Sequence, residues 1–311
     1  MYQKRAVPQQ RNPVVNSFDS NFNRCLFTSW TSFVNGNTPV LQMPVKCQGR
    51  YLQQDGTDPE DEDRAQYAVC YNTNTLIPEF TGHVLYPFEP QAGGRDEWAI
   101  DRTNRWHSFL TIPPLKANLL TGTTHSKTGH LTPNADYADE NHRQKTMLPT
   151  NIAPQWQGFN DGNWCVMEQF LRRFANIERH ELYIFTGTSG QATNRARTPL
   201  TLNRRVVIPK YYWKAVCDPV HSQSIFFYAR NPTDVTTLNK RVSAYFGQQT
   251  ETSGVVMCDS INGGSETIES EGALGQTYPN LGTRLRACSP DRLGAIFREF
   301  IQRLPRNFQW E

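Results

Sequence analysis

The segment NDGNWCVMEQFLRRFANI, residues 160–177, constrains the fold of this chain more than any other stretch. Its large apolar residues recur at the three- and four-residue spacing of one helical face: Trp164, Met167, Leu171 and Phe174. A helix with a single apolar stripe must bury that stripe against another layer of structure. We therefore predict a helix over residues 160–177 that begins at Asn160 and packs its stripe into the core.

Other stretches are rich in β-branched and aromatic residues and predict strands: 67–88, 180–188, 205–217 and 224–230. An Asn-Thr-Asn turn divides the first of them into two strand-like runs, which is a hairpin signal. A second helix is predicted over residues 289–305, with a serine at its cap and Pro305 at its end. Such strands with a few helices indicate an α+β fold, in which helices flank a central, mostly antiparallel sheet.

The 311 residues divide into three expected parts. Residues 1–24 are rich in Gln, Asn, Arg and Pro and are expected to form a flexible tail. Residues 25–75 are expected to form a small β-rich region, and residues 76–311 the main domain. Hydrophobic residues make up 37% of the chain, which is enough to fill the core of such a domain.

Charge and cysteine content narrow the class of protein only a little. A net charge of +3 does not by itself indicate a polyanionic partner, although a basic cluster is formed by Arg195, Arg197, Arg204 and Arg205. No stretch approaches the roughly 20 apolar residues of a membrane span, so no membrane partner is expected. The seven cysteines contain no CxxC pair. Cysteines scattered in this way are typical of a disulfide-stapled secreted protein, and buried free thiols are the alternative.

A histidine, an asparagine and an arginine in the middle of the chain suit phosphodiester hydrolysis. His130 offers a base whose ordinary pKa lies near neutrality. Asn160 offers a carbonyl oxygen to Mg²⁺, which keeps most of its waters, and Arg172 offers a planar fork for phosphate. Each residue alone also has a structural interpretation, as a turn histidine, a helix N-cap, and one half of a surface ion pair with Glu168.

Taken together, these residues resemble the DNA/RNA non-specific endonucleases of the ββα-metal type. The hallmark of that family is a D-R-G-H segment, followed further along by a run like N-x-A-P-Q…N-x-x-x-W…E…R. This chain has Gly129-His130 and then NIAPQ at 151–155, and the rest of the run is matched by Asn160, Trp164, Glu168 and Arg172. The resemblance spans about residues 76–230 and looks closest to secreted invertebrate members, the duplex-preferring nucleases and double-strand RNases.

The resemblance implies a ββα-metal nuclease fold, with residues 76–311 as the nuclease domain. It implies a sugar-non-specific endonuclease that depends on Mg²⁺, with Mn²⁺ or Ca²⁺ as substitutes, and that leaves 5′-phosphate ends. The expected partner is DNA, RNA or both, as duplexes. The resemblance and the cysteines together imply an extracellular protein. The first thirty residues show no apolar leader, so either a leader lies outside this chain or the protein stays inside the cell.

The resemblance also assigns roles to particular residues. His130 would be the general base and Asn160 the protein ligand of the metal. Asn151 would help to hold the site in shape, Glu168 would contact a metal-bound water, and Arg172 would stabilise the phosphate. Substrate contacts are expected from three further residues, Lys127, Arg102 and Arg105, and the sequence does not choose between the two arginines.

One position departs from the family pattern. Thr128 stands where the family has an arginine, and Lys127 stands where it has an aspartate. A lysine supplies a flexible point charge rather than a fork, and loss of one phosphate-directed group costs on the order of a hundredfold in rate. The alternative function is therefore a catalytically weakened relative that binds nucleic acid.

Two other hydrolase classes fit the sequence poorly. The spacings of His125, His130 and His142 match no usual zinc motif, and HExxH is absent. The run GTSGQ, residues 187–191, lacks the second glycine of a serine-hydrolase elbow.

Overall fold

The computed structural model describes residues 15–16, 50–54, 67–72, 74–88, 126–147, 149–194, 196–202, 204–231, 244–250, 254–270, 294–297 and 299. Nearly all of the expected tail over residues 1–24 lies outside this set. Among the described residues, no helix is both long and apolar enough to span a bilayer.

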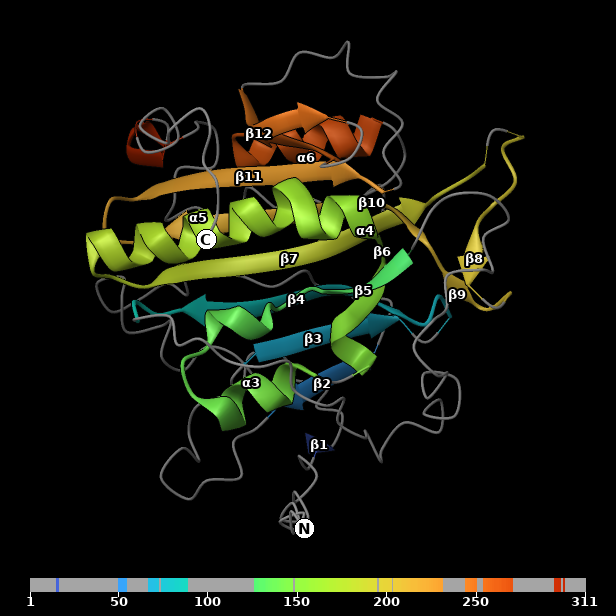
Figure 1. Cartoon of the computed structure of the whole chain (residues 1–311), viewed down its shortest axis with the longest axis horizontal. Helices are drawn as coiled ribbons and strands as arrows, with labels where there is room; N and C mark the ends of the chain where they lie inside the picture. Colours follow the sequence, from blue (N-terminus) through green and yellow to red (C-terminus); the bar gives the residue numbers. More distant parts are fainter. Residues whose placement is uncertain are drawn as a thin grey trace, which may run out of the picture.

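A single sheet of nine strands runs through the centre of the protein (Figure 1). Its order is β1-β2-β3-β4-β7-β10-β11-β13-β12, and every neighbouring pair is antiparallel. The strands are β1 (Val15–Asn16), β2 (Arg50–Gln54), β3 (Tyr67–Asn72), β4 (Ile77–Leu85), β7 (Leu182–Gln191), β10 (Pro209–Asp218), β11 (Gln223–Arg230), β12 (Ala244–Thr250) and β13 (Gly254–Asp259). The predicted α+β fold with a mostly antiparallel sheet is confirmed.

The predicted hairpin of residues 67–88 forms from β3 and β4. Its turn is fixed by Asn72, whose side-chain oxygen accepts hydrogen bonds from the backbone N–H groups of Asn74 and Thr75 at 2.9 and 3.2 Å. Leu76 completes the turn in the left-handed region, with φ of 59°. The expected boundary between residues 75 and 76 falls within this hairpin, and β2 and β3 belong to the same sheet as β4.

The central helix differs from the prediction at its start. A continuous helical run comprises α4 (Gln157–Phe159), the wide π-helical turn η4 (Asn160–Trp164) and α5 (Cys165–Glu178). Asn160 has helical dihedrals of −62° and −44°, so the interpretation of Asn160 as a helix N-cap is wrong. The reason is that strand β6 (Ile152–Trp156) passes directly into the helix, which therefore begins one turn earlier. Because Gly162 breaks the helical geometry, regular 100° spacing does not relate Asn160 to Glu168.

The helical run lies across one face of the sheet (Figure 1), and its apolar stripe is buried in the core, as predicted. Trp164, Met167, Leu171 and Phe174 are all buried. The rings of Phe159 and Trp164 meet edge to face at 5.2 Å, and Trp164 meets Tyr212 of β10 at 5.8 Å. Edge-to-face contacts of this kind add to the stabilisation from burial. The helix is thus anchored to the middle of the sheet.

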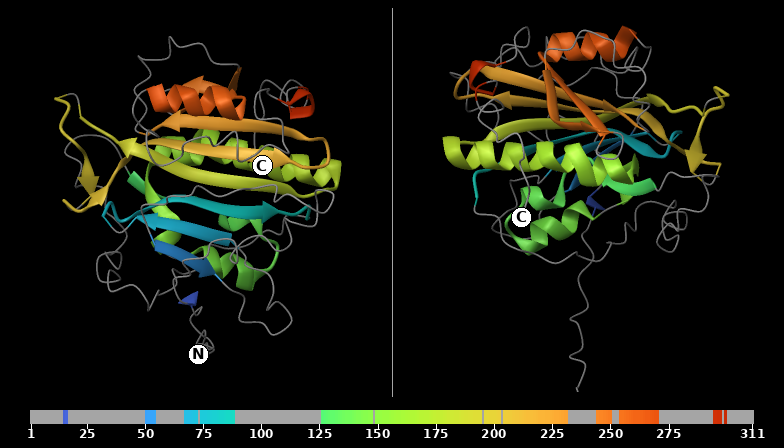
Figure 2. Two further views of the ribbon diagram at one scale, coloured as in Figure 1. Left: turned by 180° about the vertical axis from the view of Figure 1, so that it is seen from behind. Right: turned by 45° about the horizontal axis from the view of Figure 1, so that its top comes forward.

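On the other face of the sheet, α6 (Ile261–Ser270) packs over β11 and β13 (Figure 2). Its Gly264 lies against the ring of Phe226 in β11, which itself stacks on Trp213 at 5.9 Å. Of the helix predicted over 289–305, the structure describes only residues 294–297 and 299. Within that part, residues 295–297 are helical and Phe297 packs on Phe174 at 4.5 Å.

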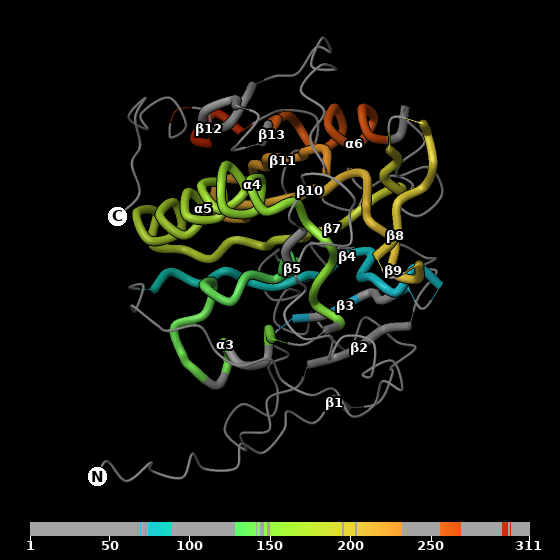
Figure 3. Tube along the Cα trace, turned by 45° about the vertical axis from the view of Figure 1, so that its right-hand side comes forward, coloured from blue at the N-terminus to red at the C-terminus, as the bar shows by residue number. Residues whose placement is uncertain are grey.

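Three smaller elements surround the sheet. Strand β5 (Ser126–His130) pairs with β6 as a separate two-stranded ribbon, and α3 (Glu140–Thr146) lies between them in the chain. A second ribbon, β8 (Thr201–Leu202) with β9 (Val206–Val207), lies beside the β3–β4 turn, where Val207 N–H donates to Thr75 O at 3.0 Å (Figure 3).

Gly264→Ala tests the packing of α6. A Cβ at this position would lie 2.2 Å from Cδ1 of Phe226, a ring held in place by Trp213. We expect the free energy of unfolding to fall by roughly 1–3 kcal/mol, which outweighs the gain of about 1 kcal/mol in helix propensity. Denaturant unfolding measures the change. The exposed control Glu266→Ala should be nearly neutral, and a stabilised Gly264→Ala would contradict this packing.

Candidate active site

His130 and Asn160 come from one β5–β6–helix unit. His130 is the last residue of β5 and pairs with Ile152, the first residue of β6. Strand β6 then leads without a loop into the helical run that carries Asn160. Gly129 makes the ribbon possible, because a Cβ there would lie 2.1 Å from Oε1 of the buried Gln155. The Gly-His and Ala-Pro-Gln parts of the sequence motif are therefore packed against each other.

His130 is half-buried and its Nε2 lies 3.3 Å from Sδ of Met147. Burial lowers the pKa of His130 to about 4. The imidazole is consequently neutral near pH 7, which is the form that can accept a proton from water.

Asn151 is fully buried and uses its amide to connect three backbone segments. Its Nδ2 donates to the carbonyl oxygens of Thr132 and Thr146, each at 2.9 Å. Its Oδ1 accepts from the N–H of Thr132 at 2.9 Å, and its own carbonyl oxygen accepts from the N–H of Leu131 at 2.9 Å. Asn151 thus fastens the segment that follows His130 to the end of α3.

Asn160 presents an amide that suits a hard cation. Its Nδ2 donates to Oδ1 of Asp161 at 3.3 Å. Within the described residues, its side-chain carbonyl oxygen, Oδ1, accepts no hydrogen bond. The side chain is partly exposed, so the oxygen is open to a ligand. A side-chain carbonyl oxygen is a ligand type that Mg²⁺ takes, usually with several retained waters. The residues present therefore fit a magnesium ion.

Glu168 and Arg172 take part in a chain of charges beneath the helix. Arg172 donates to Oδ1 of Asp136 at 2.7 Å, and Oδ2 of Asp136 lies 2.9 Å from Nε2 of the buried His83. Glu168 lies 3.8 Å from Nζ of Lys214, which donates to Thr186 at 2.6 Å. The interpretation of Glu168 and Arg172 as an ordinary surface ion pair is therefore wrong, because both side chains pair with buried partners.

Burial sets the protonation of this chain of charges. It raises the pKa of Glu168 to about 7, an effect that Lys214 opposes and that Asp136 reinforces. Burial lowers the pKa of Lys214, while Glu168 and Asp136 oppose that change. The pKa of Asp136 nevertheless lies below its ordinary value, since its hydrogen bond to His83 and the charge of Arg172 outweigh burial. Glu168 is thus a member of the chain whose charge changes near pH 7.

The sequence did not point to His83, Asp136 or Lys214. Two of them left a trace in the sequence. Lys214 is a charge in the middle of the apolar strand run YYWKAVC, and Asp136 follows the Gly-His motif by a few residues. A charged residue inside a buried strand requires a partner, which is the signal that would have found Lys214.

Most of the residues expected to contact the substrate are not described by the structure. Arg102 and Arg105 lie outside the described residues, as does the side chain of Lys127. Thr128 lies in β5 opposite Pro154 and is partly buried. In the basic cluster Arg197, Arg204 and Arg205 are exposed, and Arg195 lies outside the described set.

Comparison with known families identifies the family of this chain. A family model of DNA/RNA non-specific endonucleases matches residues 50–262, more than half of the chain. This chain belongs to the DNA/RNA non-specific endonuclease family. The match covers β5, β6 and the helical run, so His130 and Asn160 lie within it.

Individual relatives are more distant. A salivary endonuclease of Lutzomyia longipalpis is 28% identical over 195 residues, which cover 56% of this chain and 47% of that protein. A salivary endonuclease of Culex quinquefasciatus is 27% identical over 106 residues, covering 33% of this chain and 29% of that protein. The chain thus spans about half the length, or less, of these curated relatives. A solved structure of the EndoG/EndoGI complex aligns with a TM-score of 0.45 at 16% identity, over 74% of this chain and 90% of that chain.

Glu168→Gln tests the raised pKa of the Glu168 carboxylate through the pH dependence of stability. Because the folded pKa of Glu168 is raised from 4.5 to about 7, its contribution to stability is complete below pH 4.5 and is lost as pH rises through 7. The loss is on the order of 1–3 kcal/mol. We expect the wild-type unfolding free energy, measured in EDTA from pH 4 to 8.5, to fall relative to that of Glu168→Gln over this window.

His130 makes an opposite contribution, because its lowered pKa makes stability fall as pH drops below 6.5. Both the wild type and Glu168→Gln contain His130, so this contribution cancels when the two are compared at each pH. The exposed control Glu140→Gln should follow the wild type at every pH. A constant difference between wild type and Glu168→Gln across the range would show that Glu168 titrates as an ordinary carboxylate.

Proposed function

We propose that this chain is a metal-dependent endonuclease that hydrolyses phosphodiester bonds of DNA, RNA or both and leaves 5′-phosphate ends. The observation that carries the proposal is the β5–β6–helix unit, which brings His130 at a strand end and Asn160 in the following helix into one continuous element. Family membership supports the same assignment.

The residues divide the chemistry among them. His130, neutral near pH 7 because burial lowers its pKa, takes a proton from the attacking water. The carbonyl oxygen of Asn160 would hold Mg²⁺, or Mn²⁺ or Ca²⁺ as substitutes. When bound, such an ion supplies positive charge against the phosphate and the leaving oxygen. Asn151 keeps the segment after His130 in position through its buried hydrogen bonds.

Glu168 and Arg172 complete the proposed site. The carboxylate of Glu168 would accept a hydrogen bond from a water near Asn160. Arg172 uses one terminal nitrogen for Asp136, and its planar guanidinium has further N–H groups for a phosphate oxygen. Because Asp136 fixes the orientation of Arg172, the guanidinium loses little freedom when the substrate binds.

Recognition of nucleic acid is proposed to depend on the backbone rather than on the bases. We propose that the exposed arginines of the β8–β9 ribbon contribute phosphate contacts, with Arg102, Arg105 and Lys127 as further candidates. Contacts of this kind are independent of sequence and fit duplexes of DNA or RNA.

We further propose that the protein acts outside the cell. Two relatives are named salivary endonucleases, and the cysteines are scattered as in secreted proteins. Cys165 and Cys258 have free thiols, which leaves five other cysteines for disulfides. Expression in an oxidising compartment, followed by mass spectrometry of the unreduced protein, would identify such bonds.

His130→Gln and Asn160→Ala test the proposed chemistry. Loss of a general base lowers rates by about 10²–10⁴-fold, so His130→Gln should cut supercoiled plasmid and long double-stranded RNA at least that much more slowly. Asn160→Ala should require a higher Mg²⁺ concentration for the same rate. His142→Gln, a partly buried histidine on α3, is the matched control and should cut at the wild-type rate.

Wild-type cutting that persists in EDTA, or in His130→Gln, would contradict the proposal. The ratio of rates on the two substrates measures the preference between DNA and RNA. If the wild type binds duplexes but does not cut them, the weakened-relative alternative is favoured. Thr128→Arg should then restore cutting, since Thr128 occupies the position of the family arginine.

Arg204→Ala with Arg205→Ala tests the ribbon contacts. Both side chains are exposed, so the double variant should fold normally. If each neutralises one phosphate, the slope of log Kd against log salt on duplex should flatten by nearly 2. Fluorescence anisotropy in EDTA measures this without cleavage. The exposed Arg173→Ala is the single-charge control, and an unchanged slope in the double variant would place these arginines outside the interface.

A further inference from the structure

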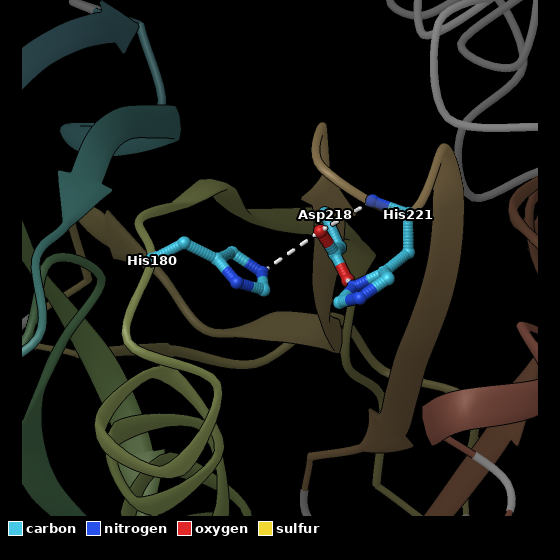
Figure 4. Close-up of side chains that lie close together, drawn as sticks. All are labelled: His180, Asp218 and His221. Carbon is cyan, nitrogen blue, oxygen red and sulfur yellow. Dashed lines mark hydrogen bonds and ion pairs between the residues drawn. The ribbon is translucent and has the colours of Figure 1, made fainter.

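A second cluster of metal-ligand side chains lies away from His130 and Asn160. His180, just after α5, faces Asp218 at the end of β10 and His221 in the following turn (Figure 4). Their ligand atoms all lie within 4.8 Å of one another. His180 Nε2 is 2.9 Å from Oδ1 of Asp218, and His221 Nδ1 is 2.7 Å from Oδ2 of Asp218. The cluster is far from Asn160. Glu178, two residues before His180, lies at the other end of the helical run, roughly 27 Å from Asn160 at 1.5 Å per residue.

The two nitrogens of His180 both face oxygen acceptors. Nδ1 lies 3.2 Å from the carbonyl oxygen of Glu178, and a carbonyl oxygen can only accept, so Nδ1 has the hydrogen. In the neutral ring Nε2 then has a lone pair, which lies 2.9 Å from a carboxylate oxygen. Among the described residues Nε2 has no hydrogen bond of acceptable geometry. Two electron pairs this close require a positive charge between or beside them.

A metal ion between His180 and Asp218 would account for the short contact without a hydrogen bond. Zn²⁺ lies about 2.0–2.1 Å from both histidine nitrogen and carboxylate oxygen, so two such ligands at the tetrahedral angle are about 3.3 Å apart, a few tenths of an ångström more than the 2.9 Å between His180 Nε2 and Asp218 Oδ1. The ion lies to one side of the line that joins them, whereas a hydrogen bond needs its hydrogen on that line. The backbone carbonyl on Nδ1 is also the usual partner that fixes the tautomer of a metal-binding histidine.

The carboxylate of Asp218 is held rigidly for this purpose. Its Oδ1 accepts from the N–H groups of Val220 and His221 at 3.0 and 3.1 Å, and its Oδ2 accepts from Nε2 of Gln223 at 2.8 Å. The side chain is fully buried. His221 is a third exposed at its side chain (33%), so the cluster opens to solvent on that side and leaves room for a water ligand.

We propose that His180, Asp218 and His221 bind one transition-metal ion of the Zn²⁺ class, separately from the Mg²⁺ proposed at Asn160. Two imidazoles and one carboxylate favour zinc, cobalt or nickel over magnesium or calcium, which prefer all-oxygen sites. Three protein ligands with one open position is a common zinc arrangement. A bound ion would join the C-terminal end of α5 to the β10–β11 turn and so stabilise the fold.

The test is binding of Zn²⁺ and Co²⁺ by the full-length chain. Competition with a chromophoric chelator should give one zinc equivalent that is absent from His221→Gln and His180→Gln. Co²⁺ should give visible absorption bands of a four-coordinate site in the wild type only. At about 100 times Kd, zinc should raise Tm by about 5 °C in the wild type and much less in the variants.

Controls separate this site from the proposed active site. His142→Gln should retain the zinc equivalent, and Asn160→Ala should retain it too. His221→Gln keeps the backbone contacts of its turn and should cut nucleic acid with Mg²⁺ at the wild-type rate. If that variant instead fails to fold, the Co²⁺ spectrum of the wild type decides alone. Absence of the bands, or equal zinc binding by His221→Gln, would overturn the proposal and indicate a protonated His180 paired with Asp218.

Discussion

The carboxylate of Asp136 is the contact on which the proposed site depends. It lies in the segment after His130, receives Arg172 from α5 at 2.7 Å, and lies 2.9 Å from His83 of β4. Three elements that are far apart in the sequence are thereby joined at one buried carboxylate: the ribbon that carries His130, the helix that carries Asn160, and the central sheet. Neither oxygen is left without a partner, as a carboxylate in a protein interior requires.

The charges beneath α5 balance as a group rather than as separate pairs. Arg172 and Lys214 supply positive charges, and Asp136, together with Glu168 when it is ionised, supplies negative ones. Burial lowers the pKa of His83, which is consequently neutral. Removing any one charge would leave an uncompensated buried ion, which is typically costlier than the pair is worth. Glu168 has the weakest compensation, since Lys214 is 3.8 Å away. Burial therefore raises the pKa of Glu168, because Lys214 offsets the effect only in part, and an added cation nearby would favour the charged form of Glu168.

The sequence predicted those features that depend on periodicity and short motifs. The stripe Trp164 to Phe174 and the aromatic strands were sufficient to predict the sheet with a helix packed on it. The start of the helix at Gln157 and the wide turn around Gly162 were missed, because β6 enters the helix with no loop residues to mark a boundary. His83 and Asp136 were missed because their pairing joins residues 53 positions apart and has no local signature. The cluster at His180 and Asp218 was missed for the same reason.

Because no loop separates β6 from the helix, regular backbone structure sets the relative position of His130 and Asn160. The register of β5 on β6 fixes His130 opposite Ile152, and backbone hydrogen bonds maintain that register. From Ile152 the chain reaches Asn160 through strand and helix alone, with every intervening residue in regular structure. The relative position of His130 and Asn160, the proposed base and the proposed metal ligand, therefore depends on backbone geometry, and the side chains around them can vary. A change such as threonine at position 128 can then alter contacts with the substrate while the framework that positions His130 and Asn160 remains.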